Sequence, residues 1–386
     1  MAQAQKLTPA QAQSQNAQAR YAMLTNSPRY VKNLGTFTAN AGATAATTRI
    51  KLQNVGIITK LRLYVTANLT IGTANAVQST KGPYNLIDRI RVADFANQDR
   101  VNCSGFQLFM ANCVRSKRFF GANNMAATAV FTNPSYPITI GAKTISFFMD
   151  VPLAYDAENP IVGLQDLRGA ILAQTGVGEL YLSIDWLKTL VSTAGDIDAV
   201  YSGAGTTTVV GTAGNNDVSV TVWQEYIFPQ AIPGTNTVPM PMQDLMTVYE
   251  LNGYIKSSDN LAVNQEKLIN VPNVRSVIGA YYNYVTGGAA AQGNVAKIRF
   301  IANGNNVITE DTELSALFRQ RMYCNSDTVA GAMFSTFRER PIETSLYGNV
   351  QVGFTPAVVS GGNQYVELLW EDFYVSGAAL PGVLTS

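Results

Sequence analysis

The sequence contains no histidine among its 386 residues. Histidine is the usual general base and proton shuttle of enzymes, and it is the commonest metal ligand in proteins. Its absence argues against most acid–base chemistry, and we expect neither an enzyme nor a bound cofactor. The formal net charge is only +1, so the chain lacks the positive excess that neutralises nucleic-acid phosphates. We therefore expect no sequence-specific binding of nucleic acid.

Charged side chains are also scarce. They make up 14% of the chain, against about 25% in an average globular protein. Hydrophobic residues reach 47%, with 18 Tyr and 16 Phe. Two explanations remain open: neighbouring subunits cover much of the surface, or the surface is rich in Thr, Asn and Gly, as in many secreted β proteins.

The cysteines and the hydrophobic runs give little support for a secreted or membrane-spanning protein. Cys103, Cys113 and Cys324 are an odd number without CxxC spacing, which suits a reducing compartment. No stretch approaches the roughly 20 apolar residues that span a bilayer. The N-terminus has no apolar core of the kind that a secretory signal needs. We expect the protein to be made and assembled in cytoplasm.

Two segments of the chain resemble each other. Residues 218–226 read VSVTVWQEY and residues 365–373 read YVELLWEDF, each with a Trp (Trp223, Trp370) followed three residues later by an aromatic (Tyr226, Phe373). A repeated strand ending suggests two copies of one β domain, with these four residues as its framework. Such a chain is better suited to be a building block than an enzyme.

The rest of the chain is dominated by β patterns. Leu61, Leu63 and Val65 alternate within residues 57–69, which is the period of a half-buried strand. Further strands are expected at 90–92, 144–151, 180–187, 276–285, 296–301, 347–354 and 365–370. Many short strands separated by turn residues indicate sandwiches or barrels rather than a parallel βαβ sheet.

Each half also contains one segment with helical spacing. The apolar residues of the first stripe are Phe106, Phe109, Met110, Cys113 and Val114, and those of the second are Leu314, Leu317, Phe318 and Met322. Basic residues near the end of both segments suit the helix dipole. Each half is therefore expected to combine strands, one amphipathic helix and a closing Trp strand.

The first 20 residues differ from the rest, because six are Ala and six are Gln. Thr8-Pro9 looks like a helix start, and a polar helix to about Ala22 could follow. Such a helix has only marginal stability alone. The segment is therefore either a disordered tail or an arm that becomes ordered against a neighbour or a surface. Its only charges, Lys6 and Arg20, favour an acidic or anionic contact.

Four segments follow from these patterns. We expect an N-terminal helix or arm over 1–35, a first β domain with inserted loops over 36–230, a linker over 231–243, and a second β domain with a C-terminal tail over 244–386. Prolines at 229, 233, 239 and 241 suppress regular structure around the linker.

Two acidic pairs offer a rival chemistry. Asp196 and Asp198 would share a face in an extended segment and are weak Ca²⁺ candidates, but no ligand cluster surrounds them. Glu371 and Asp372 are adjacent, so in a strand they point to opposite faces. Structural roles are the better interpretation for both pairs, and we assign no metal site.

The chain resembles the major capsid proteins of tectivirus-type bacteriophages. These are membrane-containing phages whose capsids share the double jelly-roll plan of adenovirus hexon. The motifs that carry the resemblance are LTPAQ (7–11), NVGIITK (54–60), NLIDRIRV (85–92), NQDR (97–100), SGFQLF (104–109), VPLAY (151–155), YSGAG (201–205), TVWQEY (221–226), DLMTVYEL (244–251) and LYGNVQVGF (346–354). Each motif is weak alone, but their ordered set over nearly the whole chain is specific.

The resemblance implies an all-β protein with two eight-stranded jelly rolls, each with a short flanking helix, plus an N-terminal helical arm. It also implies a homotrimeric capsomer of pseudo-hexagonal outline that tiles an icosahedral shell over an internal membrane. Partners would be neighbouring trimers, vertex or penton proteins and minor capsid proteins, in a virion assembled in bacterial cytoplasm. The arm, with Lys6, Leu7, Thr8, Pro9 and Arg20, would face the membrane or adjoining capsomers. The alternative is a β-rich spike or carbohydrate-binding virion protein.

Overall fold

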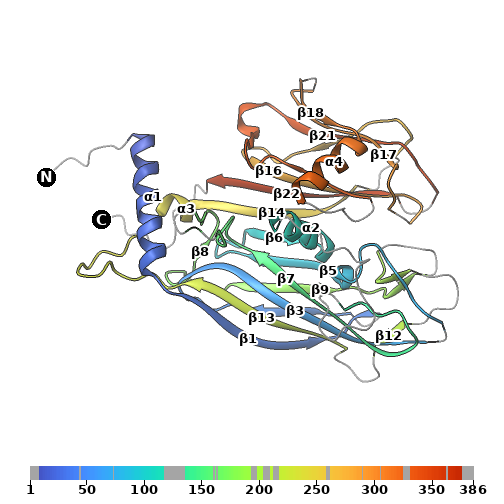
Figure 1. Cartoon of the computed structure of the whole chain (residues 1–386), viewed down its shortest axis with the longest axis horizontal. Helices are drawn as coiled ribbons and strands as arrows, with labels where there is room; N and C mark the ends of the chain where they lie inside the picture. Colours follow the sequence, from blue (N-terminus) through green and yellow to red (C-terminus); the bar gives the residue numbers. More distant parts are fainter. Residues whose placement is uncertain are drawn as a thin grey trace.

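The computed structural model describes residues 8–375, except for residues 43–44, 73, 117–134, 160, 162–163, 193–197, 203–208, 212–216, 258–260, 289, 305, 325–330 and 362–363. Strands dominate this part of the chain and form two bodies that lie side by side (Figure 1). The N-terminal helix stands across one end of the molecule.

The first body consists of two facing sheets of antiparallel strands. The strands of one sheet, in spatial order, are β1 (Arg29–Ala39), β13 (Val218–Ile227), β3 (Ile57–Ile71) and β7 (Gly141–Pro152). Those of the other are β2 (Thr47–Lys51), β9 (Tyr181–Trp186), β5 (Ile87–Ala93) and β6 (Asp99–Cys103). Short strands β8 (Ile171–Leu172) and β12 (Val209–Gly211) extend the first sheet, while β4 (Val77–Gln78), β10 (Val191–Ser192) and β11 (Tyr201–Ser202) form a small sheet of their own.

The second body repeats this order. One sheet runs β14 (Thr247–Ser257), β22 (Tyr365–Val375), β16 (Ser276–Val285), β19 (Ala332–Thr336). The other runs β15 (Lys267–Asn270), β21 (Val350–Pro356), β17 (Val295–Ala302), β18 (Asn306–Asp311), and β20 (Ile342–Glu343) pairs with β16. In both bodies the first long strand lies beside the last, which is the winding of a jelly roll. The expected double jelly roll is confirmed.

One continuous sheet joins the two rolls. Strand β6 of the first roll pairs in parallel with β14 of the second, with Val101 opposite Leu251 and Asn102 opposite Asn252. The result is a 9-stranded sheet that contains strands from both rolls. This shared sheet fixes the position of each roll relative to the other.

Helices occupy equivalent places in the two rolls. Helix α2 (Gly105–Ser116) follows β6, and α4 (Glu313–Cys324) follows β18. Figure 1 shows α2 between the rolls and α4 on the second roll. The other helices are α1 (Pro9–Asn26), α3 (Met242–Met246), η2 (Tyr84–Leu86) and η4 (Thr344–Leu346). None of the helices in the described residues is long and apolar enough to span a membrane.

The strand pattern begins earlier than expected, and the N-terminal helix ends later. Strand β1 starts at Arg29 rather than near Thr36, and α1 continues to Asn26 rather than Ala22. The two helical segments lie where their apolar spacing predicted them. However, the α4 stripe, which we define as Leu314, Phe318 and Met322, faces away from its own roll, because Ala316, Gln320 and Cys324 are buried instead.

The first hydrophobic core reaches beyond the first roll. It includes Tyr281, Phe334, Leu369 and Phe373 of the second roll. We call this side of sheet β14–β22–β16–β19 the second outer face. Its burial against the first roll means that the two rolls are packed as one unit, not as separate domains on a string.

Candidate interaction surfaces

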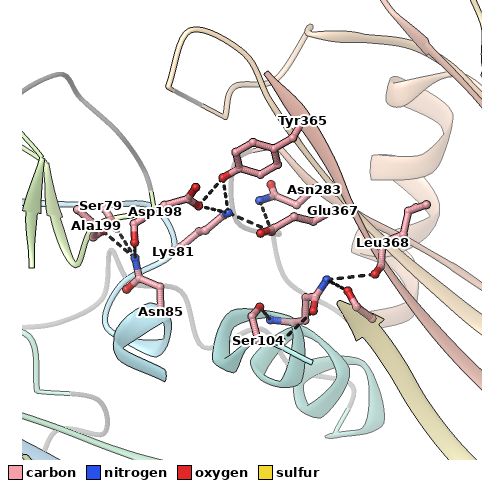
Figure 2. A network of polar contacts seen from close by, with 12 residues as sticks. Ser79, Lys81, Asn85, Ser104, Asp198, Ala199, Asn283, Tyr365, Glu367 and Leu368 are labelled. Carbon is pink, nitrogen blue, oxygen red and sulfur yellow. Dashed lines mark hydrogen bonds and ion pairs between the residues drawn. The ribbon is translucent and has the colours of Figure 1, made fainter. Parts of the chain in front are cut away.

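A buried lysine lies at the junction of the two rolls (Figure 2). Lys81 precedes η2 in the first roll, and its side chain is 3% exposed. Its Nζ lies 3.0 Å from Oε2 of Glu367 on β22 and donates to the Tyr365 hydroxyl at 2.8 Å. It also lies 2.8 Å from Oδ1 of Asp198. A buried ammonium thus binds acceptors from both rolls, which balances the cost of desolvating it.

This contact also bears on the Ca²⁺ candidates. Asp196 lies outside the described residues, and Asp198 is engaged by Lys81 and by the hydroxyl of Tyr365. Within the described part of the chain, no group of three or more His, Cys, Asp or Glu side chains is placed to hold a metal ion. The chemistry of Asp198 here is that of an ion pair.

Helix α2 is bound to the second roll by its side chains. The amide of Gln107 donates to the carbonyl oxygens of Gly253 (2.5 Å) and Leu368 (3.1 Å), which lie on β14 and β22. The Arg115 guanidinium donates to the Tyr249 hydroxyl at 3.0 Å. These bonds satisfy backbone and side-chain groups that the joined rolls remove from water.

A second buried charge, Glu371, lies on the second outer face. It accepts hydrogen bonds from Arg338 (2.8 Å) and from the hydroxyls of Tyr249 (2.8 Å) and Tyr281 (2.9 Å), and Arg115 lies 3.8 Å away. Burial alone would raise the pKa of Glu371, but the two arginines and the two hydroxyls outweigh it, so its pKa is lowered. Glu371 is therefore a stably ionised structural group.

The neighbouring Asp372 has a different environment. Burial, followed by the Glu250 carboxylate, raises its pKa to about 7, although Arg275 opposes the shift. The Nε of Arg275 lies 3.5 Å from Oδ1 of Asp372. Glu371 and Asp372 thus have separate partners, and the pair forms no shared acid–base site.

Helix α1 is fixed to the segment between the rolls. Thr8 caps it in a capping box with Gln11, and Pro9 is its first residue. The Asp244 carboxylate accepts from Asn16 at 2.8 Å and from Arg20 at 3.1 Å. The basic residue Arg20 therefore has its acidic partner in its own chain, while Lys6 and Leu7 lie outside the described residues.

The four framework residues have unequal surroundings. Trp370 is buried in the second core and meets Phe300 edge-on, with ring centroids 6.2 Å apart. Phe373 lies between the rolls against Tyr155, at 5.0 Å. Trp223 and Tyr226 are only half-buried. The sequence repeat therefore marks equivalent strands but not equivalent side-chain directions.

Among the exposed large apolar side chains of the described residues, two groups bear on assembly. The α4 stripe is one, with Leu314 79%, Phe318 65% and Met322 73% exposed. The other is the side of sheet β1–β13–β3–β7 that faces away from the first core, where Phe148 is 54% exposed. We call it the first outer face. The first outer face, Lys81 and Asp244 were not predicted as contact sites, because their partners are distant in the sequence.

Comparison with known proteins is consistent with this architecture. Residues 2–229 match the family described as P3 major capsid protein N-terminal. The chain is 27% identical to major capsid protein P3 of Enterobacteria phage PRD1, over 96% of this chain and 95% of that protein. The fold is similar to the STIV MCP (TM-score 0.65, 14% identity, 92% of this chain and 100% of that one). It is also similar to major capsid protein P2 from bacteriophage PM2 (TM-score 0.51, 11% identity, 92% and 100%).

Proposed function

Because the chain belongs to the P3 major capsid protein family and is a structural protein of a phage capsid, we propose that it works as a homotrimer. Three chains with two similar rolls each supply six similar bodies around a three-fold axis. Such a capsomer has a nearly hexagonal outline and can tile the facets of an icosahedral shell.

The observation that carries this proposal is the fusion of two rolls of the same strand order through β6 and β14. Each chain thus holds two similar rolls in a fixed arrangement, and three chains would supply the six members of a ring. The free energy of closing the ring comes from buried apolar area, at roughly 25 cal/mol per Å². Obligate subunit contacts commonly bury more than about 2,000 Å², and the exposed aliphatic and aromatic side chains of both rolls suit such contacts.

The N-terminal segment is proposed as a contact with the surroundings of the capsomer. Helix α1 lies across one end of the molecule (Figure 1). Its residues Arg20 and Asn16 are already bound to Asp244. This leaves the segment before Asn16, with Lys6, Leu7, Thr8 and Pro9, to meet an internal membrane or an adjoining capsomer. Vertex and minor capsid proteins would bind the same shell.

The role in the particle is proposed to be structural rather than catalytic, with assembly in the bacterial cytoplasm. The buried acids support this, because Glu371 and Glu367 are paired with cations inside the fold. No second function is favoured by a specific observation.

Native mass spectrometry and electron microscopy of the purified protein test the proposal together. We expect the mass of three chains and three-fold particles with a near-hexagonal outline. A protein that remains a monomer at high concentration, or rings of another order, would contradict the trimer while leaving the family assignment in place.

A further inference from the structure

The α4 stripe is exposed where its counterpart in the first roll is buried. Leu314, Phe318 and Met322 follow one another at four-residue spacing, so they lie on one side of the helix. Contiguous exposed apolar side chains of this size mark interaction surfaces in soluble proteins. The question is which surface covers them.

Helices α2 and α4 can be aligned from their first residues. The Ser104 hydroxyl accepts from the backbone N–H of Gln107 at 3.2 Å, and the Thr312 hydroxyl accepts from that of Ser315 at 3.2 Å. Both helices follow directly after equivalent strands of their rolls. Gln107 and Ser315 therefore occupy equivalent positions.

With this alignment, the residues that match the α4 stripe are Phe106, Met110 and Val114. Their exposed fractions are 2%, 1% and 1%, against 79%, 65% and 73% in the stripe. The two helices thus carry apolar residues at the same three positions. Packing within the chain accounts for the burial of α2, so the structure itself shows what kind of surface covers such a helix.

Helix α2 is sandwiched between its own roll and the second outer face. It contacts β16, Gln107 binds the Leu368 carbonyl on β22, and Arg115 binds the Tyr249 hydroxyl on β14. The second outer face also carries a cross-strand aromatic pair, Tyr281 on β16 opposite Phe334 on β19. These two side chains are 2% and 5% exposed.

The first outer face carries the matching pair. Tyr64 on β3 lies opposite Phe148 on β7, and the rings are 4.6 Å apart. β3 and β7 occupy the places in the first roll that β16 and β19 occupy in the second. Here, however, Phe148 is 54% exposed. The chain therefore exposes both surfaces of such a contact, the α4 stripe and the first outer face. Their counterparts, α2 and the second outer face, already pack together within the chain.

We propose that the α4 stripe of one copy packs on the first outer face of the next copy, as α2 packs on the second outer face within the chain. The inference rests on the proposed homotrimer and names the surfaces that close it. The contact is head-to-tail, because its two halves belong to different rolls, and such contacts close into rings when the rotation allows. Three of them, alternating with three contacts within chains, complete the six-membered ring.

The first test places charges in the α4 stripe without touching a core. Phe318→Asp combined with Met322→Asp places charges on exposed positions, and Val177→Asp, at a position 85% exposed, is the matched control. By analytical ultracentrifugation we expect trimers for the wild type and the control, and folded monomers for the double variant. A double variant that stays trimeric would overturn this inference alone. A monomeric wild type would overturn the trimer proposal and the inference with it.

The second test maps the contact directly. Within the chain, Gln107 binds Leu368, and the next residue, Leu369, pairs with Tyr281. In the first roll, Tyr64 is the counterpart of Tyr281, and it pairs with Thr221. Ser315, the counterpart of Gln107, is therefore expected near Thr221 of the next copy. Chains with Ser315→Cys and chains with Thr221→Cys are co-expressed and treated with a short bis-maleimide. The three native cysteines are buried, which limits background labelling.

Covalent dimers should form only when both kinds of chain are present. Dimers from either variant alone would indicate a two-fold contact and overturn the proposal. Absence of mixed dimers from a sample that ultracentrifugation shows to be trimeric would overturn it as well.

Discussion

The ammonium of Lys81 and the carboxylate of Glu367 lie 3.0 Å apart at the junction of the rolls, with side chains 3% and 5% exposed. The two residues belong to different rolls, so they form a buried ion pair that joins the rolls. Because removal of one partner leaves the other charged and buried, such pairs are costly to break.

We therefore expect Lys81→Met to lower the free energy of unfolding by about 3–5 kcal/mol. Urea denaturation of the purified protein measures this. The matched control is Lys51→Met, whose partner Glu179 is exposed and whose own side chain is 61% exposed. Solvent screens an exposed pair, so the control substitution should have little effect. Equal effects of the two substitutions would contradict the role of the buried ion pair between the rolls.

The raised pKa of Asp372 predicts that the free energy of unfolding depends on pH. Its pKa of about 7 is above the ordinary value, so ionisation is harder in the folded protein than in the unfolded chain. The stability present below the unfolded pKa is lost as pH rises, and the loss is complete above pH 7. The size is on the order of a few kcal/mol.

Asp372→Asn should flatten this dependence between about pH 4 and about pH 7. Urea denaturation at several pH values compares the variant with the wild type. Glu339→Gln, at an exposed position, should leave the wild-type slope unchanged. A slope that persists in Asp372→Asn would assign the titration to another group.

Local patterns in the sequence were sufficient to predict the positions of the helices but not the surfaces that cover them. Apolar spacing placed α2 and α4 because side chains three and four residues apart share a face. Which stripe is buried depends on the other roll. Lys81 shows the same limit: no local pattern marks it, yet its ammonium is buried and donates to the hydroxyl of Tyr365, which is 284 residues away in the chain.

The Trp repeat shows a second limit. In β13 the buried residues around the Trp are Val218, Val220, Val222 and Gln224, so Trp223 faces outward. In β22 Trp370 itself lies in the second core. Because side chains alternate along a strand, a shift of one position exchanges the two faces. The repeat therefore predicted the duplication correctly but could not indicate the direction of each side chain.

Asp244 should control the docking of α1. Burial raises its pKa although Arg20 opposes the shift, and its carboxylate holds both Arg20 and Asn16. We expect Asp244→Ala to release the helix and to increase the rate of tryptic cleavage after Arg20. Gln243→Ala is the control, since Gln243 binds Asn16 through its backbone N–H. Equal cleavage rates in the two variants would argue against the role of the carboxylate.

Truncation separates the proposed arm from the capsomer. Removal of residues 1–15 spares Asn16 and Arg20, and the buried residues Met23 and Leu24 still pack against the first roll. The truncated protein should therefore form trimers as the full chain does, because the proposed ring contacts lie on other elements. Particle yield should fall, since the segment that meets the membrane or the next capsomer is gone. Ultracentrifugation and electron microscopy measure the two readouts, and removal of residues 1–5 alone is the control. Closed particles in normal yield from the longer truncation would show that residues 1–15 have no role in assembly.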